Sequence, residues 1–482
     1  MKIAIIGAGP AGLVAAKEAV DAGMIPTVFE KKNSIGGLWS REDGHVWNEM
    51  RTNLSKWTCS FSDFPWPIGA ELFPKSGDVQ EYLKSYCQKF NLKPHLRFGQ
   101  EVCSIEKCSD GFQVQLSNKH MEAFDKVVVA SGVFSRPWTP TLKRENETNV
   151  VHVHSSNIDR IDEVRGKTVC VIGGSFSGIE ISQLLVERGA LKVYFISTSS
   201  TWVIPRRVID ECTGHEIPID FLFYKRQEKS EDETCETEIN NQTFDFFEKK
   251  FGNPGMANQK LYLKRNGAPN YVAISDKFLE YVKSGSIVPI RSRFHEFSSN
   301  GVVVENGITI LSQIVVFCTG YECNLDYLSA QIRDSVDYDP NDKFMPFIAN
   351  RATHNPKVSG LYFVGMYRGP YFGVMELQAR WIMSHIGNPE KNFQLAEANR
   401  LEFENVRRNK FPQPQFPYGD YIDFCDVLAQ DIDIFPEKCS NDNVANLIRT
   451  GPVVPAHYRI GNVVDEEDEF VKIIKGINHI TE

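Results

Sequence analysis

The sequence lacks the features that mark membrane, secreted and nucleic-acid-binding proteins. No apolar run reaches the about 18 to 20 residues that a membrane-spanning helix needs. The 11 cysteines form no repeated pair at the spacing of zinc sites or thioredoxin-type centres, which indicates reduced thiols and a cytoplasmic protein. The formal charge of −9 argues against nucleic acid and anionic membranes as partners, because both attract clustered Lys and Arg. We therefore expect a small-molecule partner.

Length and composition fit a folded enzyme with more than one domain. At 482 residues the chain exceeds the usual limit of a single hydrophobic core. Hydrophobic residues make up 42% and charged residues 24%, which is ordinary for a globular protein. Apart from two similar glycine patterns, the sequence has no internal repeat and no low-complexity tract.

The N-terminal segment has the pattern of a βαβ unit. Lys2–Ile6 and Pro26–Glu30 are apolar runs typical of buried parallel strands, and Pro10–Ala22 between them has a helical pattern. The first residues also resemble a short signal peptide, but cleavage there would destroy the glycine-rich turn that follows the first strand.

That turn is a glycine pattern of the dinucleotide-binding type. Gly7 permits the tight turn, Gly9 lets a pyrophosphate approach the backbone, and Gly12 allows the helix to pack closely. Glu30 ends the second strand, where its carboxylate can accept hydrogen bonds from a ribose diol. The pattern alone is weak, but its place between strand and helix together with Glu30 predicts a dinucleotide site.

A second βαβ unit begins much later in the chain. Thr168–Ile172 and Lys192–Ile196 are predicted strands, and Phe176–Arg188 is a predicted amphipathic helix. Between the first strand and the helix lies another glycine turn, in which serine replaces the middle glycine. The sequence therefore predicts two Rossmann-like units in an α/β protein.

The second unit has no acid at the end of its second strand. Ser197 and Thr198 follow Ile196, so a 2′-phosphate would meet no carboxylate repulsion. Arg206 could supply a cation for this phosphate, which favours NADPH over NADH. An ordinary surface ion pair made by Arg206 or Arg207 is the alternative.

The remaining segments give a coarse outline of the chain. Val127–Ala130 and Ile314–Phe317 are predicted buried strands, and Arg136–Pro140 marks a domain junction. Lys225–Gly252 is acidic and polar, which predicts a surface excursion. From Pro412 onward, short mixed segments predict a covering C-terminal region.

Two dinucleotide sites in one chain imply electron transfer from a nicotinamide to a flavin. Several further segments resemble motifs of the flavin-containing monooxygenases in order and spacing. These segments are Gly36–Trp39, Arg51–Lys56, Phe61–Pro65, Ala130–Gly132, Cys318–Tyr321 and Glu376–Trp381. The resemblance extends from Met1 to about Gly461.

The resemblance implies FAD and NADPH as cofactors and an NADPH domain inserted in the FAD domain. We expect the first part of the FAD domain at 1–165, the NADPH domain at 166–292, and the second part with the covering region at 293–482. The predicted cofactor-binding residues are Gly7, Gly9, Pro10, Ala11, Gly12, Glu30, Lys31, Gly37, Leu38, Trp39, Thr52, Asn53, Val102, Ala130, Ser131, Gly132, Gly173, Ser175, Phe176, Ser177, Gly178, Arg206, Gly320 and Gln378.

The activity implied by the resemblance is oxygenation of a soft nitrogen or sulfur atom of an amine or sulfide by a peroxide formed on the flavin from O2. Asn53 matches the asparagine that this family places beside the flavin, where its amide could donate a hydrogen bond. A turn asparagine is the alternative interpretation. The sequence shows no catalytic triad, acid pair or metal cluster, so a shielded pocket with few donors must suffice.

The sequence also departs from the family pattern. Of the family's identifying motif, only His154 and Ser155 remain, and Trp-Pro does not follow the histidine as it would in Baeyer-Villiger enzymes. The alternatives are an NAD(P)H oxidase that releases hydrogen peroxide, a ketone monooxygenase, and a flavin-binding interaction protein without turnover. A disulfide reductase is disfavoured, because the sequence has no close pair of redox cysteines. The sequence does not identify the substrate, and it is compatible with a homodimer.

Overall fold

The computed structural model describes residues 1–42, 45–211, 213–226, 235–369, 371–387, 400–401, 403–408, 415–416, 420–435, 442–459 and 469–481. The chain divides into two compact units. Unit 1 comprises Met1–Ser135, Arg207–Glu228 and Cys323–Glu482, and unit 2 comprises Arg136–Arg206 and Lys229–Glu322.

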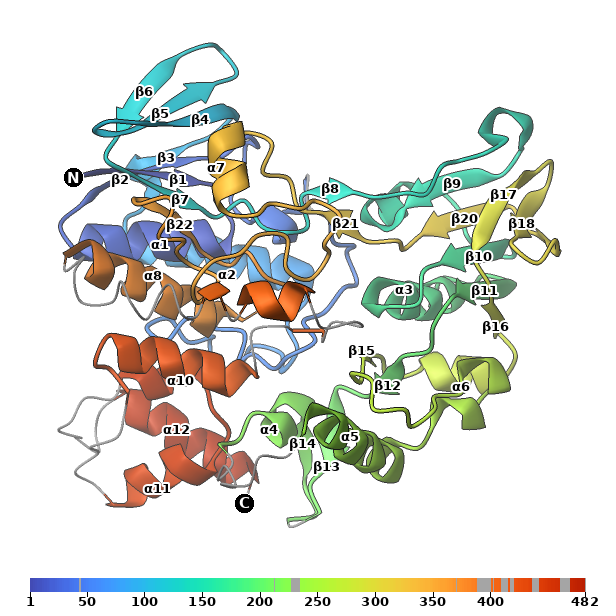
Figure 1. Ribbon diagram of the computed structural model, residues 1–482. Coiled ribbons are helices and arrows are strands. Elements are labelled where there is room, and N and C mark those ends of the chain that lie inside the picture. Colours follow the sequence, from blue (N-terminus) through green and yellow to red (C-terminus); the bar gives the residue numbers. More distant parts are fainter. Residues whose placement is uncertain are drawn as a thin grey trace. The chain divides into compact units, whose positions relative to one another are not determined.

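A parallel sheet of five strands forms the centre of unit 1 (Figure 1), in the order β22-β7-β1-β2-β3. The strands are β1 (Lys2–Ile6), β2 (Ile25–Phe29), β3 (Leu96–Arg97), β7 (Lys126–Val129) and β22 (Leu361–Phe363). Strand β1 pairs in parallel with β2 on one side and with β7 on the other. The carboxyl ends of these strands therefore meet at one edge of the sheet.

The two faces of this sheet bury alternate residues of β1. Ile3 and Ile5 pack in the apolar cluster that contains helices α1 (Pro10–Asp21), α2 (Ser76–Lys89) and α8 (Phe372–Gly387). Ala4 and Ile6 pack in the cluster of an antiparallel sheet made of β4 (Val102–Cys108), β5 (Gly111–Leu116) and β6 (Met121–Phe124). Burial on both faces explains why β1 is apolar from Ile3 to Ile6.

Helices cover the C-terminal part of unit 1. They are α7 (Ala330–Ser335), α10 (Tyr421–Asp431), α11 (Asp442–Thr450) and α12 (Glu469–Thr481). The described part of the region from Pro412 onward thus contains helices, and 412–414, 417–419, 436–441, 460–468 and 482 lie outside the described residues. In α10, Tyr421, Cys425 and Leu428 recur at helical spacing and are buried, which favours a helix.

The middle of the chain also contributes to unit 1. Strands β13 (Arg207–Ile209) and β14 (Glu216–Pro218) form an antiparallel hairpin that leads into helix α4 (Ile219–Phe223). The residues on both sides of this segment in the sequence belong to unit 2.

Unit 2 is built around a second parallel sheet of five strands, in the order β16-β11-β10-β20-β9 (Figure 1). The strands are β9 (Val151–His154), β10 (Thr168–Ile172), β11 (Lys192–Ser197), β16 (Ile287–Arg291) and β20 (Ile314–Phe317). Smaller sheets pair β8 (Arg136–Pro137) with β21 (Tyr321–Glu322), and β12 (Trp202–Ile204) with β15 (Val272–Ile274).

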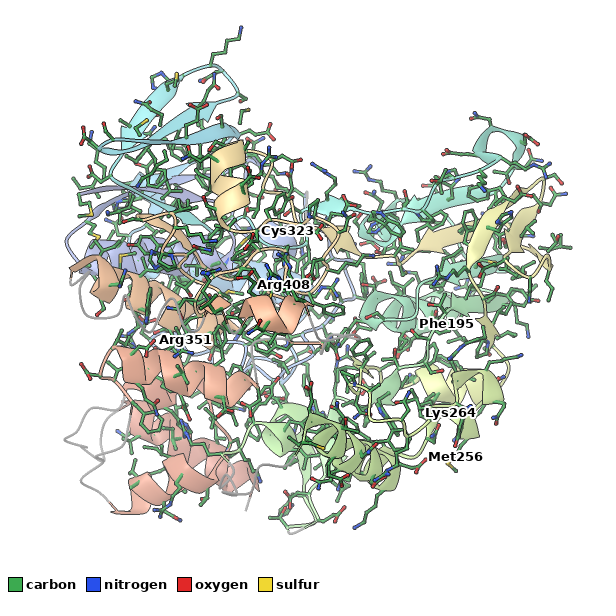
Figure 2. The ribbon with its side chains drawn as sticks, in the orientation of Figure 1. Phe195, Met256, Lys264, Cys323, Arg351 and Arg408 are labelled. Carbon is green, nitrogen blue, oxygen red and sulfur yellow. The ribbon has the colours of Figure 1, made fainter. Side chains whose placement is uncertain are left out.

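This second sheet is also covered by helices on one face and by strands on the other. Helices α3 (Phe176–Glu187) and α6 (Phe278–Lys283) lie on the first face, where the ring of Phe195, labelled in Figure 2, is 5.1 Å from that of Phe278. The other face packs on the antiparallel sheet of β17 (Phe294–Ser298), β18 (Gly301–Val304) and β19 (Thr309–Leu311).

The second part of the predicted surface excursion over Lys225–Gly252 forms a helix that is mostly exposed. Glu236–Phe251 form helix α5, and 227–234 lie outside the described residues. Phe244 and Phe247 are buried, with ring centroids 5.1 and 5.4 Å from that of Trp202. Their spacing of three residues places both on one helix face, and this short apolar stripe was outweighed by the acidic composition of the segment.

The boundaries of the units differ from the domain boundaries expected at 165/166 and 292/293. Unit 2 begins at Arg136, within the predicted junction, because β9 pairs with β20 and completes the second sheet. It extends to Glu322 because β17–β19 pack on that sheet. The return of 207–228 to unit 1 had no signal in the sequence.

Candidate functional site

The glycine turn of unit 1 joins β1 to α1. Gly7 has φ +108°, and a Cβ atom there would lie 2.7 Å from the carbonyl oxygen of Ala130. Its N–H donates to the carbonyl oxygen of Phe29 at 2.8 Å. A Cβ atom on Gly12 would collide with the carbonyl oxygen of Gly7. Packing within the protein therefore requires both glycines, whatever binds beside them.

Gly9 is different, because the protein leaves space beside it. Its backbone is extended, and a Cβ atom there would meet only Gly37, at an ordinary distance of 3.5 Å from its Cα atom. The first turn of α1, which starts at Pro10, presents the N–H groups of Ala11 and Gly12 that have no acceptor within the helix. Open space beside these donors fits the pyrophosphate of a dinucleotide.

Glu30 is held next to this turn. Its carboxylate is buried and accepts hydrogen bonds from the N–H of Ala8 at 2.8 Å and of Lys32 at 2.9 Å. Each carboxylate oxygen keeps a second lone pair, so Glu30 can still accept from ribose hydroxyls. The geometry fits the role that the sequence predicts, whereas Lys31 beside it is exposed.

The segment Gly36–Trp39 lies against the glycine turn of unit 1. The N–H of Gly36 donates to the carbonyl oxygen of Ala8 at 3.1 Å, and Gly37–Trp39, with Leu38 between them, form a short 3-10 helix. A Cβ atom on Gly37 would lie 2.9 Å from the Cα atom of Gly9. The structure thus brings together two glycines from motifs that are 28 residues apart.

Residues 130–132 follow β7 at the same edge of the sheet. The N–H of Ala130 donates to Ile6, and the hydroxyl of Ser131 lies 2.8 Å from that of Tyr327. The N–H of Gly132 points to the sulfur of Met366 at 3.1 Å. Tyr327 and Met366 were not predicted, because neither belongs to a recognisable motif.

Asn53 lies in a loop that backbone hydrogen bonds fix to a neighbouring segment. The N–H of Thr52 donates to Pro74 at 2.9 Å, and that of Lys56 donates to Leu72 at 2.7 Å. Asn53 is half-buried, whereas Thr52 is buried. The loop thus holds Asn53 in a defined position with part of its surface exposed.

Two of the predicted residues, Gln378 and Val102, have structural roles within unit 1. The fully buried amide of Gln378 accepts from the N–H of Gly365 at 2.9 Å and donates to the carbonyl oxygens of Arg351 and Ala352. It thereby supports a turn in which both Arg351, labelled in Figure 2, and Ala352 have positive φ. Val102 begins β4 and is buried in the apolar cluster of that sheet.

Unit 2 repeats the glycine geometry of unit 1. Gly173 has φ +127°, and a Cβ atom there would collide with the carbonyl oxygen of Cys318. A Cβ atom on Gly178 would collide with the carbonyl oxygen of Gly173. Ser175 is the N-cap of α3, whose first residues are Phe176 and Ser177. The structure therefore brings together five of the predicted residues at one helix N-terminus.

Arg206 lies between two carboxylates of unit 2. Its guanidinium donates to Glu180 at 2.7 Å and to Asp276 at 3.0 Å. Burial raises the pKa of Glu180 to about 7, although the charge of Arg206 acts in the opposite direction. A phosphate would have to share Arg206 with these two acids.

His154 remains from the family's identifying motif and holds the segment of Gly320. The Nε2 atom of His154 is 3.0 Å from the carbonyl oxygen of Gly320, and its Nδ1 atom accepts from the N–H of Ser156. Both residues lie in unit 2, where the ring of Tyr321 packs edge-on against that of His154. Gly320 therefore belongs to the framework of unit 2.

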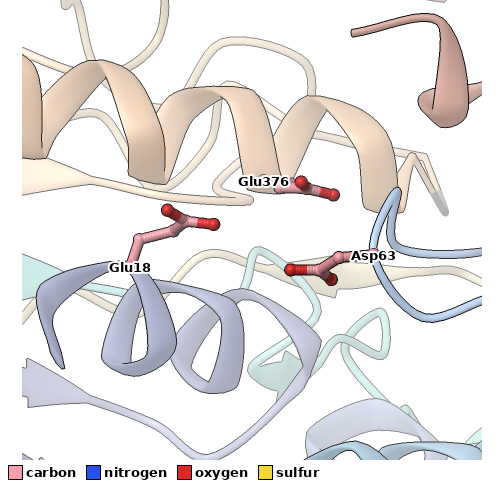
Figure 3. Close-up of side chains that lie close together, drawn as sticks. All are labelled: Glu18, Asp63 and Glu376. Atoms are coloured by element: carbon pink, nitrogen blue, oxygen red, sulfur yellow. The ribbon is translucent and has the colours of Figure 1, made fainter. Parts of the chain in front are cut away.

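Glu18, Asp63 and Glu376 converge in unit 1, as Figure 3 shows, with carboxylate oxygens within 4.8 Å of one another. Lys17 contacts Asp63 at 2.7 Å and Glu18 at 3.0 Å. Arg459 contacts Glu376 at 2.7 Å and Asp63 at 3.1 Å. The two cations compensate the acids and tie the C-terminal region to α1 and α8.

Comparison with known proteins extends these observations. Residues 1–464 match the family described as flavin-binding monooxygenase-like. A rat protein named dimethylaniline monooxygenase [N-oxide-forming] 2 is 28% identical over 491 residues, covering 95% of this chain and 88% of that protein.

Solved structures have the same fold at lower identity. S-allyl-L-cysteine S-oxygenase from Allium sativum superposes with a TM-score of 0.59 and 20% identity, covering 90% of this chain and 88% of that one. Cyclohexanone monooxygenase from Rhodococcus sp. Phi1 bound to NADP+ gives a TM-score of 0.68 and 17% identity, covering 90% and 97%. Among the described residues, no helix is long and apolar enough to cross a membrane.

Proposed function

The chain belongs to the flavin-binding monooxygenase-like family, and from this we propose that it oxygenates a soft nucleophilic nitrogen or sulfur atom of a small molecule. Membership makes the chain a flavin-dependent monooxygenase with FAD and NADPH as cofactors and O2 as cosubstrate. When bound, these cofactors supply the reducing electrons and activate oxygen.

The protein's own residues would bind and orient the cofactors. In our proposal, unit 1 holds FAD, with the pyrophosphate beside Gly9 and the ribose at Glu30, and unit 2 holds NADPH at the turn of Ser175. The open space at Gly9 and the buried carboxylate of Glu30 support the first assignment. The absence of an acid after Ile196 and the guanidinium of Arg206 support the second.

Asn53 is the proposed catalytic residue. Its amide would donate a hydrogen bond to the reacting oxygen or to the nicotinamide, a role that needs no charge and no proton transfer. Its half-buried position in a fixed loop of unit 1 supports this role.

The choice of nitrogen or sulfur rests on the extended match to a protein named for N-oxide formation. The fold is shared with a ketone-oxidising enzyme, so a Baeyer-Villiger activity is the second candidate. The Trp-Pro pair that Baeyer-Villiger enzymes have after this histidine does not follow His154, which favours the first. The remaining alternative is an oxidase that releases hydrogen peroxide.

The decisive experiment measures NADPH-driven oxygen uptake with trimethylamine, a thioether or cyclohexanone, and quantifies peroxide and product together. We expect an N-oxide or a sulfoxide. Lactone without N-oxide or sulfoxide would favour the Baeyer-Villiger alternative, and stoichiometric peroxide without any product would favour the oxidase.

The scattered cysteines support a cytoplasmic location. The assembly is proposed as a monomer or homodimer, which gel filtration would distinguish.

Asn53→Ala should separate cofactor reduction from oxygenation. FAD should remain bound, because the pyrophosphate and ribose contacts that we propose lie elsewhere. Product per NADPH should fall about tenfold or more, as expected for loss of one positioned donor, while peroxide rises. Unchanged product per NADPH would show that Asn53 is only a turn residue.

Arg206→Ala should weaken NADPH about ten- to a hundred-fold with little effect on NADH, because one charge-assisted phosphate contact is worth about 1.5 to 3 kcal/mol. The neighbouring Arg207→Ala is the matched control, since Arg207 pairs with Glu216 in unit 1. Equal effects of Arg206→Ala on the two cofactors would remove it from the 2′-phosphate site.

A further inference from the structure

A buried carboxylate of unit 1 is used by none of the contacts described so far. Asp220 lies in α4, in the segment that leaves unit 2 and returns to unit 1, and its exposed fraction is 1%. Burial raises the pKa of Asp220, which means that the fold stabilises its charged form less than water does. Such a residue needs enough hydrogen bonds to offset its desolvation.

Three hydrogen bonds to the carboxylate of Asp220 come from the turn that follows Asn53. The hydroxyl of Ser55 donates at 2.6 Å, the hydroxyl of Thr58 donates at 2.7 Å, and the N–H of Ser55 donates at 3.1 Å. Ser55 and Thr58 are themselves buried. The carbonyl oxygen of Ser55 closes the turn by accepting from the N–H groups of Thr58 and Cys59.

The segment that carries Asp220 is itself firmly anchored in unit 1. Arg226, six residues after Asp220, donates two hydrogen bonds to the carboxylate of Asp426 at 2.8 and 2.9 Å. The carbonyl oxygen of Tyr224 accepts from the N–H of Val453 at 2.6 Å. Asp220 is therefore held in place by contacts separate from those it makes with the turn.

We propose that Asp220 is a positioning residue that fixes the Ser55–Cys59 turn and, through it, the orientation of Asn53 during oxygenation. The proposal rests on the function proposed for Asn53. Backbone hydrogen bonds to Leu72 and Pro74 hold the loop on one side, and Asp220 holds it through side chains on the other. An apolar residue at 220 would leave two buried hydroxyls without this acceptor.

The test compares variants that remove one side of this contact at a time. Asp220→Asn removes the charge and Thr58→Val removes the hydroxyl, each with little change in volume. Thr58→Ser keeps the hydroxyl. Asp210→Asn is the control, because Asp210 is a buried acid of the same segment that accepts from Thr213 instead. Flavin content, product and peroxide per NADPH, and the visible circular dichroism of bound flavin are measured.

We expect Asp220→Asn and Thr58→Val to keep FAD but to lower product per NADPH at least fivefold, and to shift the flavin spectrum as Asn53→Ala does. Thr58→Ser should restore both values, and Asp210→Asn should change neither. Adding Asp220→Asn to Asn53→Ala should cause no further loss, because both act on one amide.

Hydrogen exchange of the peptide spanning 52–59 gives a readout that does not depend on product. We expect at least tenfold faster exchange in Asp220→Asn. Unchanged exchange, or faster exchange with a wild-type flavin spectrum, would overturn the proposal. A wild-type protein that forms no oxygenated product would instead contradict the proposed function, and the exchange and spectrum of the variants would still decide the role of Asp220.

Discussion

The two units have the same framework but different residues at the positions that would meet a ligand. In each, a parallel sheet with its βαβ glycine turn lies between helices and a three-stranded antiparallel sheet. Gly12 and Gly178 occupy the same place, since a Cβ atom on either would collide with the carbonyl oxygen five residues earlier. These glycines serve the fold rather than one particular ligand.

Three of the corresponding positions that differ lie where they would affect a ligand. Unit 1 has Gly9 at the N-cap of its helix, whereas unit 2 has Ser175. The N–H groups of Gly7 and Gly173 donate to Phe29 and Ile196, so Glu30 corresponds to Ser197. Buried Val14, two residues after Gly12, corresponds to Glu180, two residues after Gly178. Nucleotide preference should therefore depend on these positions and not on the shared glycines.

The largest expected effect concerns the helix N-caps. Gly9→Val should reduce the flavin content of the purified protein to less than a tenth, because its methyl groups would fill the space beside the backbone that a pyrophosphate needs. Ser175→Val, the matched change in unit 2, should leave flavin content unchanged and weaken NADPH. Absorbance of released flavin and NADPH titration measure the two effects.

Gly12→Ala serves as the control for packing. It should lower the free energy of unfolding by about 1 to 3 kcal/mol, because its Cβ atom collides with the protein itself. A well-folded Gly9→Val variant with full flavin content would contradict the assignment of FAD to unit 1.

A smaller effect is expected from making unit 2 resemble unit 1 at the second strand. Ser197→Glu places a carboxylate at the position that corresponds to Glu30. Gly174 corresponds to Ala8, whose N–H donates to Glu30. Repulsion of the 2′-phosphate should raise the KM for NADPH about ten- to a hundred-fold relative to that for NADH. Steady-state kinetics with both cofactors check this, and a parallel change for both would place the phosphate elsewhere.

The smallest expected effect is a pH dependence of stability from Glu180. Burial raises its pKa in the folded state to about 7, above the ordinary value of 4.5, so the protonated form stabilises the fold. This contribution is complete below pH 4.5 and is lost as pH rises through 7, which amounts to about 1 kcal/mol between pH 6 and 8. Urea unfolding at these two pH values measures it.

Glu180→Gln should remove that pH dependence, whereas Glu187→Gln on the same helix should not. A wild-type stability that stays constant or rises between pH 6 and 8 would show that the ion pair with Arg206 outweighs burial.

Local patterns were sufficient for the central strands and turns. Strands β1, β10 and β20 have the predicted bounds, because a strand buried on both faces must be apolar at every buried position. The glycine turns were equally readable, since only glycine fits where a Cβ atom would meet backbone. Helix α5 was missed because two buried phenylalanines are a weak signal in an acidic segment.

The sequence by itself determined the two nucleotide-binding units and the family, because each depends on residues within short, continuous motifs. Tertiary structure alone decided that 207–228 return to unit 1, that Arg206 lies between Glu180 and Asp276, and that Asp220 holds the turn after Asn53. These contacts join residues that are 26 to 165 positions apart in the chain. Such pairs form through burial and hydrogen bonding in the folded core, which leave no periodic pattern in the sequence.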